Sequence, residues 1–421
     1  MFKTKTISLI NNYVMAGVIV LGFIVGISRT YYGTGTMQKV YLGLMIILLL
    51  LEILLSFGGK FEKTLPFEGL FMAVVTSVIT VPYLFQNVED WITNYGYVII
   101  WGFLLSLLVV RHGDSFIRAL LYTFALMMIV LNFENLGQFV EKWPPFYNSL
   151  HIATDGSYNY KFGIEGYRTM SYFGHPIPAG LFFAFSFFLF KGINKGKISG
   201  IMQLISLVNL YTTQSRSDWI AFAVVYIIFL FPKYNKLMKS DRAEKLLSRI
   251  AITIVAFGAV VVWGSKIWTS IMLRFGDTLS LQSTSGSNLQ RLGTMRVIFE
   301  HFSQSSLMVK LFGEGVGSSS DFMRTHTILI PFFSTTDNQY LTFLFEFGLI
   351  GLLGYLFFYV YFFFRDSQNS FSWVGISSVG LTLISQFFFV ASSWIPVYML
   401  FVFGTLIGIV NDADKKREEF E

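Results

Sequence analysis

Arg216, Arg291 and Asp337 combine the residue types needed to bind a phosphate and to act as a general base. A planar guanidinium can hold a phosphate through two parallel hydrogen bonds, and a carboxylate can accept a proton from an attacking hydroxyl. Arg216 lies where one apolar run ends and the next begins, Arg291 lies in a long polar stretch, and Asp337 shortly precedes another apolar run. These residues would form a catalytic site if the fold brings them together.

Each of the three residues also has a simpler interpretation. Arg216 could extend its side chain to a membrane interface, with Ser217 or Asp218 capping the next helix. Arg291 could be an ordinary solvated side chain, and Asp337 could be a helix N-cap. Spacing along the chain does not decide between these interpretations, because it does not show which residues meet.

Several residues near these three are candidates for substrate binding. Gly313, Gly315 and Gly317 could form a turn whose backbone approaches a phosphate, or only a flexible connection. His175 precedes Pro176 and could act as a polar helix cap or contact a substrate. The candidate substrate-binding residues are Arg168, His175, Ser215, Gly315, Gly317, Asn338 and Tyr340.

The composition is that of a polytopic membrane protein. The 421 residues are 54% hydrophobic and only 13% charged, and the mean hydropathy is +0.59. A soluble protein would carry about 25% charged residues. There is no cysteine, which excludes disulfides and thiolate chemistry. The net charge of +6 comes from basic residues placed mostly between apolar runs, so it indicates membrane topology rather than nucleic-acid binding. No cleavable signal peptide is evident, and the first span is expected to remain as an anchor.

Twelve apolar runs are long enough to predict membrane-spanning helices. Basic residues gather in alternate loops, which predicts that both termini are cytoplasmic. The chain 1–421 is then one all-α polytopic membrane domain. Two long outer loops are expected, at 133–171 and at 265–337, the second between spans nine and ten. The predicted spans are residues 8–28, 40–57, 67–86, 94–110, 115–132, 172–190, 198–212, 217–232, 249–264, 339–364, 371–391 and 393–410.

The order of these features along the chain carries a family resemblance. Ser215-Arg216 begins a span, Arg291 follows in a long outer loop, and nine residues separate Asp337-Asn338 from Gly348. Together with the glycines at 313, 315 and 317, this order resembles the O-antigen ligase and Wzy-type polysaccharide polymerase superfamily. The resemblance covers roughly residues 163–364. It implies a membrane glycosyltransferase of the GT-C type that uses undecaprenyl-diphosphate-linked sugars at the outer face.

One departure from the superfamily pattern bears on the reaction. The ligases typically carry His where this chain has Asp337. This difference favours a polymerase of a bacterial surface polysaccharide (capsule, exopolysaccharide or O-antigen) over a ligase that transfers the glycan to another acceptor. The resemblance implies that Asp337 is the general base, and that Arg216 and Arg291 bind the diphosphate in an inverting, metal-independent transfer.

The same resemblance implies the partners and the location. The partners would be a lipid-linked donor, a lipid-linked acceptor, the lipid bilayer and a chain-length regulator, with no cofactor and no nucleic acid. The protein would lie in the bacterial plasma (inner) membrane with its active site facing outward. A lipid-linked oligosaccharide flippase or secondary transporter is the alternative of a different class. It is disfavoured because the ionisable residues gather at span ends rather than within spans.

Overall fold

The computed structural model describes residues 2–32, 35–57, 97–141, 168–173, 175–193, 196–237, 286–315, 317–364, 372–388, 397 and 399–407. These residues form helices and contain no strand, as expected for an all-α membrane protein. Three helices among them are long and apolar enough to cross a membrane, at Arg111–Val140, Pro176–Ile193 and Gln339–Phe357. The predicted spans at 67–86 and 249–264 lie outside the described residues, so the count of twelve stays a prediction.

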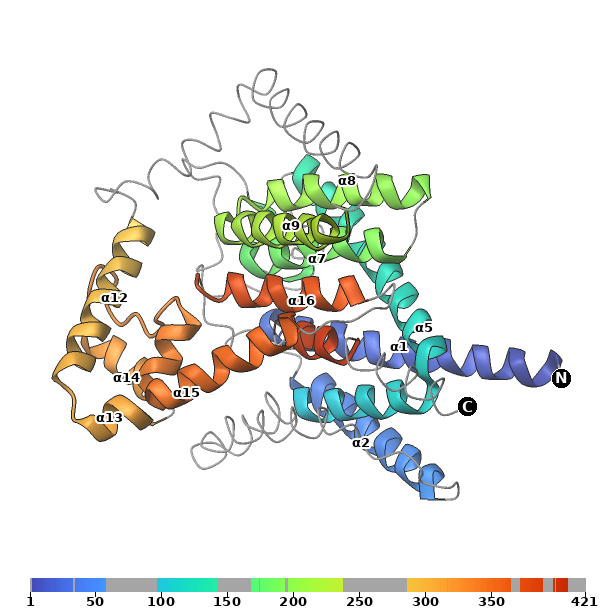
Figure 1. The fold of residues 1–421 in the computed structure, drawn as a ribbon, viewed down its shortest axis with the longest axis horizontal. Coiled ribbons are helices and arrows are strands. Elements are labelled where there is room, and N and C mark those ends of the chain that lie inside the picture. Colours follow the sequence, from blue (N-terminus) through green and yellow to red (C-terminus); the bar gives the residue numbers. More distant parts are fainter. Residues whose placement is uncertain are drawn as a thin grey trace, which may run out of the picture.

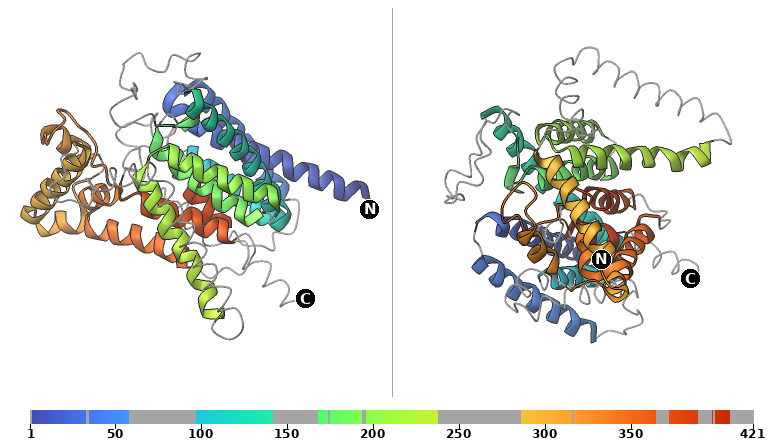
Figure 2. Two further views of the ribbon diagram at one scale, coloured as in Figure 1. Left: turned by 90° about the horizontal axis from the view of Figure 1, so that it is seen from above. Right: turned by 90° about the vertical axis from the view of Figure 1, so that its left-hand side faces the viewer.

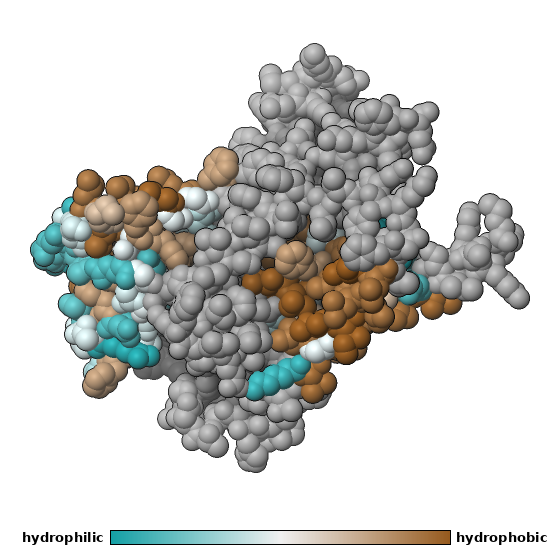
Figure 3. Space-filling model, turned by 90° about the horizontal axis from the view of Figure 1, so that it is seen from below, coloured by the Kyte–Doolittle hydropathy of each residue, from teal (hydrophilic) through white to brown (hydrophobic). Residues whose placement is uncertain are grey.

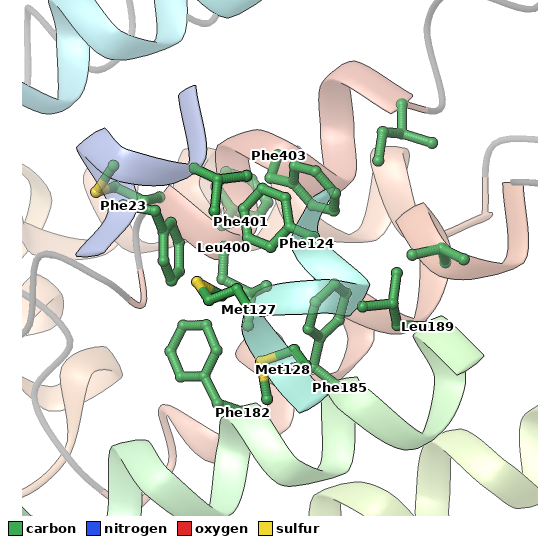
Figure 4. Close-up of a cluster of buried hydrophobic side chains, with 14 of the residues drawn as sticks. Phe23, Phe124, Met127, Met128, Phe182, Phe185, Leu189, Leu400, Phe401 and Phe403 are labelled. Atoms are coloured by element: carbon green, nitrogen blue, oxygen red, sulfur yellow. The ribbon is translucent and has the colours of Figure 1, made fainter. Parts of the chain in front are cut away.

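Most of the described helices form one bundle, which Figures 1 and 2 show from three directions. Helix α7 is its centre, because the side chains from Pro178 to Phe190 are all buried. Phenylalanine rings fill the core around it, and Phe23, Phe124, Phe182 and Phe403 meet there from separate segments (Figure 4). The helices of the bundle are α1 (Phe2–Tyr32), α2 (Gly35–Phe57), α5 (Tyr97–Glu141), α7 (Pro176–Ile193), α8 (Lys197–Thr212), α9 (Arg216–Leu237) and α16 (Ser372–Ser385).

Helix α5 is two helices joined at a break. Gly113 has φ 58° and ψ −146°, outside the helical range, and it divides the apolar runs predicted at 94–110 and 115–132. After the break α5 continues as far as Glu141, into the segment 133–171 that is predicted as an outer loop. The first part of that segment is therefore helical. The side of the membrane on which it lies stays a prediction.

The polar segment predicted as the second outer loop contains three helices where the structure describes it, and its last part, 326–337, is not helical. It contains α12 (Gly286–Gln304), α13 (Leu307–Phe312) and α14 (Ser318–Thr325), which gather beside α15 (Gln339–Phe364) at one end of the molecule (Figures 1 and 2). A small separate core holds this end together. It consists of the buried side chains of Ile298, Met323, Leu341 and Phe345.

Helix α15 does not run straight, although the sequence predicts one continuous span over 339–364. Gly348 has φ 66° and ψ −166°, which are not helical angles. The rings of Phe343 and Tyr355 stack with their centroids 4.1 Å apart. In a straight helix these residues would be separated by about 18 Å along the axis. The chain therefore turns back at Gly348, and the prediction of one uninterrupted span is wrong.

The turn at Gly348 is fixed by a backbone contact with the end of α13. A Cβ on Gly348 would lie 2.4 Å from the carbonyl of Leu311, and a Cβ on Gly313 would lie 2.3 Å from the carbonyl of Glu346. Two hydrogen bonds join the same segments, from Glu314 N to Phe345 O (3.0 Å) and from Gly315 N to Glu346 O (3.0 Å). The turn exposes carbonyl groups at the end of the first half of α15, and these bonds satisfy them. We call this contact the glycine joint.

We expect Gly348→Ala and Gly313→Ala each to destabilise the protein strongly. Both glycines have positive φ and both lack room for a Cβ, so each variant combines backbone strain of about 1–3 kcal/mol with a steric clash. The measurement is the apparent unfolding temperature of the purified protein in detergent. Gly354→Ala is the matched control, because Gly354 lies in the same helix with nothing within 4 Å of its position. Equal unfolding temperatures for all three variants would contradict the glycine joint.

Candidate active site

Asp337 and Asn338 stand immediately before the first half of α15 and have different structural roles. Asn338 is the cap, because its Oδ1 accepts hydrogen bonds from the backbone N–H groups of Tyr340 (2.9 Å) and Leu341 (3.2 Å). Asp337 does not cap the helix. Its backbone has φ 52°, and its Oδ1 accepts a hydrogen bond from Thr335 Oγ1 at 2.9 Å. The capping interpretation of Asp337 is therefore wrong, and its carboxylate is available for another role.

Arg291 faces Asp337 although the two residues are far apart in the sequence. The Nε of Arg291 lies 3.9 Å from Oδ2 of Asp337, and both side chains are about one-third exposed, at 30%. Burial raises the pKa of Asp337 above its usual range, while Arg291 and the Thr335 hydrogen bond partly oppose this rise. The N-terminal part of α12 is held here because Gln290 accepts a hydrogen bond from Leu329 N at 3.1 Å. Arg291 is thus not an ordinary solvated residue.

His175 lies within the electrostatic reach of both Arg168 and Arg291. Burial, together with the two guanidinium charges, lowers its pKa to about 3. Its Nδ1 accepts a hydrogen bond from the backbone N–H of Ile177 at 3.2 Å, so His175 caps the start of α7. In the neutral ring the proton then resides on Nε2. His175 is accordingly a hydrogen-bond donor to the site rather than a base.

Arg168 connects the site to the corner between α8 and α9. Its Nε donates a hydrogen bond to the carbonyl of Thr213 at 3.0 Å. Arg216 begins α9 at the same corner, after Ser215, whose buried hydroxyl lies 2.9 Å from the hydroxyl of Ser217. The chain therefore brings Arg216 to the corner that also holds Arg168. Ser215 is nearly inaccessible and belongs to the packing of this corner.

Asp218 is an acidic group at this corner that the sequence interpretation considered only as a cap. It is fully buried, and Arg168 is the cationic group that acts on it. Its carboxylate packs against Gly180 of α7, where a Cβ would come within 2.5 Å of Oδ2. Gly180 thus leaves the space that Asp218 occupies beside the arginine corner.

A buried ladder of amide side chains supports Arg168 and was missed by the sequence interpretation. Asn132, Asn135 and Gln138 lie on one face of α5 and are inaccessible to solvent. Asn135 Nδ2 donates hydrogen bonds to Asn209 Oδ1 (2.9 Å) and Thr212 Oγ1 (3.1 Å). Gln138 Oε1 accepts from the backbone of Met170 and Ser171, directly after Arg168. The sequence does contain a pattern that could have predicted these contacts, namely polar residues spaced three apart at the end of an apolar run.

The glycines at 315 and 317 do not form a free phosphate cradle. Gly315 N donates to the Glu346 carbonyl, and the Glu346 carboxylate accepts hydrogen bonds from Ser319 Oγ (2.5 Å) and from the backbone of Gly317 and Ser319. The N-terminus of α14 is therefore occupied by a carboxylate of the same chain. Tyr340 is likewise buried, and its hydroxyl donates to the carbonyl of Leu383 in α16. Gly315, Gly317 and Tyr340 therefore make contacts within the protein, beside the candidate site.

The structure thus brings together Arg168, His175, Arg291 and Asp337 from four segments. The arrangement provides guanidinium groups for an anion, a neutral imidazole as a donor, and a half-buried carboxylate as a proton acceptor. Among the described residues, no group of three or more His, Asp or Glu side chains is placed to hold a metal ion. These groups match the requirements of glycosyl transfer from a diphosphate-linked donor.

Residues 201–356 match the family model described as O-antigen ligase. This match confirms the resemblance to the O-antigen ligase and Wzy-type polymerase superfamily. It includes Arg216, Arg291, Asp337 and the glycine joint. Together, the family match and the apolar helices indicate a helical membrane protein of a glycosyltransferase-like class. No curated protein matches the chain.

The different roles of Asp337 and Asn338 predict different stability effects. We expect Asn338→Ala to cost about 0.5–2 kcal/mol, because two backbone N–H groups lose their acceptor. Asp337→Asn should leave stability nearly unchanged, since Asn tolerates positive φ and Asp337 caps nothing. The measurement is again the apparent unfolding temperature in detergent. A larger loss for Asp337→Asn than for Asn338→Ala would show that the roles are reversed.

Proposed function

We propose that the protein is a polymerase of a bacterial surface polysaccharide. Its donor would be a growing glycan on undecaprenyl diphosphate, and its acceptor would be the terminal hydroxyl of a lipid-linked repeat unit. The observation that carries this proposal is the 3.9 Å approach of Arg291 Nε to Asp337 Oδ2 beside Arg168 and His175. It pairs a proton acceptor with the cationic groups that a diphosphate leaving group requires.

In the proposed reaction Asp337 accepts the proton from the acceptor hydroxyl. The hydroxyl oxygen attacks the anomeric carbon of the donor sugar, and the bond from that carbon to the diphosphate oxygen breaks with inversion. The electron pair leaves on undecaprenyl diphosphate, which is the second product. Arg291 and Arg216 bind the diphosphate and stabilise its developing negative charge, with Arg168 adding to the positive field. Guanidinium groups do this without a metal ion.

Two features of the site support Asp337 rather than His175 as the base. The pKa of His175 is about 3, so its neutral ring would be a poor proton acceptor near pH 7. The pKa of Asp337 is raised by burial, which makes its carboxylate a better base than an exposed aspartate. His175 Nε2 would then donate a hydrogen bond to the donor diphosphate or to a sugar hydroxyl.

Ligase-type transfer to another acceptor is the alternative within the superfamily. Analysis of the lipid-linked glycans that accumulate on deletion of the gene separates the two. Accumulated single repeat units would support the polymerase, whereas full-length polymer on the carrier would support the ligase. The proposed location is the plasma (inner) membrane, with cytoplasmic termini and the site facing outward. A chain-length regulator is a proposed further partner.

We expect Asp337→Asn to lower polymerisation by about 10²–10⁴-fold, because the amide cannot accept the proton. The assay uses purified protein and a lipid-linked repeat unit. Asp337→His should recover part of the rate, since imidazole is basic. In the wild type, the rate should fall as pH decreases through a pKa above 3.8, because protonation disables the base. A stable Asp337→Asn variant with full activity would exclude Asp337 as the base.

We expect Arg291→Lys to lose most activity while the protein remains folded. Lysine keeps the charge but loses the planar fork that binds a phosphate through two hydrogen bonds. The matched control is Arg296→Lys, because Arg296 is exposed in the same helix. The measurements are the rate of polymerisation and the binding of a diphosphate-linked donor. Equal activity of the two variants would remove Arg291 from the proposed mechanism.

A further inference from the structure

The short helix α13 exposes an apolar face. Leu307, Met308 and Phe312 are 57–71% exposed. Met308 and Phe312 are four residues apart and therefore lie on the same side of the helix. This exposure is unusual in a segment that the sequence assigns to a polar outer loop.

Polar groups at the two ends of α13 and on Lys310 are paired by hydrogen bonds. Ser306 caps the helix by accepting from Val309 N, and Gly313 N donates to Val309 O at 2.7 Å. The ammonium group of Lys310 donates to the carbonyl of Ser303 at 2.8 Å, near the end of α12. A helix whose polar groups are paired in this way can lie in an apolar surrounding.

The glycine joint places α13 beside the apolar face of α15. Gly348 touches the backbone of Leu311 and Phe312. Directly after Gly348, the exposed residues of α15 are apolar and recur every three or four positions. They are Leu349, Ile350, Leu353 and Phe357. They belong to the half of α15 that follows the turn, residues 349–364, and this half is apolar. A face of this kind on a membrane helix is expected to contact lipid.

We propose that α13 is an interfacial helix whose Leu307, Met308 and Phe312 side chains lie among the acyl chains of the bilayer. The occupant of this surface is bilayer lipid, because α13 contacts α15 at Gly348, next to the exposed apolar residues of α15. With six residues α13 is too short to span, so it lies in the interface. Figure 3 shows apolar surface both on the bundle and at the α12–α14 end, where polar side chains alternate with it.

The insertion has a consequence for the site. Helix α12 carries Arg291 and is linked to α13 through the Lys310–Ser303 hydrogen bond. Arg291 lies about 18 Å along α12 from Ser303, so anchoring α13 would fix the far end of the helix that carries Arg291. This consequence rests on the proposed function, whereas the insertion itself does not.

The absence of cysteine allows a direct test by site-directed spin labelling. Met308→Cys and Phe312→Cys place single labels on the apolar face of α13, and Asp321→Cys places a control label at an exposed position of α14. The full chain is reconstituted in nanodiscs of phosphatidylethanolamine and phosphatidylglycerol without lipid-linked substrate. Collision of each label with oxygen and with a water-soluble nickel chelate is then measured.

We expect the oxygen-to-nickel collision ratio at 308 and 312 to exceed that at 321 several-fold, because oxygen concentrates in acyl chains. Nickel accessibility at 308 and 312 equal to that at 321 would overturn the proposal. Low accessibility to both reagents would show that protein covers α13, which also overturns it. Spin–spin broadening that disappears on dilution with unlabelled protein would identify a second copy as the occupant instead. None of these outcomes depends on activity, so they are separate from a failure of the proposed function.

Discussion

The close backbone approach between Gly313 and Gly348 is the contact on which the site depends. It allows α15 to turn back on itself, so that its first half becomes a short helix buried on nearly all sides. The hydrogen bonds from Glu314 and Gly315 occupy carbonyl groups that the turn would otherwise leave unpaired. The same contact docks α13, and the small core around Ile298 and Phe345 then packs α12 beside α15. Arg291 meets Asp337 as a result of this chain of contacts.

Burial affects the protonation states of the site residues as much as their charged neighbours do. The Asp337 and Arg291 side chains approach to 3.9 Å and are both partly exposed, so each can be reached from outside the protein. His175 is kept neutral because two guanidinium groups and burial all oppose its protonation. A neutral donor, a carboxylate and several guanidinium groups can thus coexist in one site. The surroundings of each group shift its pKa differently, and such shifts are common among acid–base groups in active sites.

Polar groups inside the helical end of α5 hold the segment that carries Arg168. Asn135 and Gln138 bind α8 and the backbone of 170–171, and these contacts are removed from solvent. Hydrogen bonds between buried amides join specific partners, so they favour one arrangement of α5, α8 and the segment at 170–171. Asp218, packed against Gly180, adds a buried carboxyl group at the same corner. The arginines are therefore held by rigid elements.

The class of the protein and most of the candidate site residues can be predicted from the sequence without a structure. Composition and apolar runs indicated a helical membrane protein, and the order Arg216, Arg291, Asp337 and Gly348 indicated the superfamily. These features are local or ordered along the chain, so they can be read without a fold. The sequence did not decide whether Asp337 or Asn338 caps α15, nor whether the glycines at 313–317 bind phosphate or backbone. Those outcomes depend on which segments approach one another. They follow from the folded structure. The turn at Gly348 directs the backbone N–H groups of 314 and 315 to carbonyl groups of α15. It also leaves the Asp337 carboxylate facing Arg291.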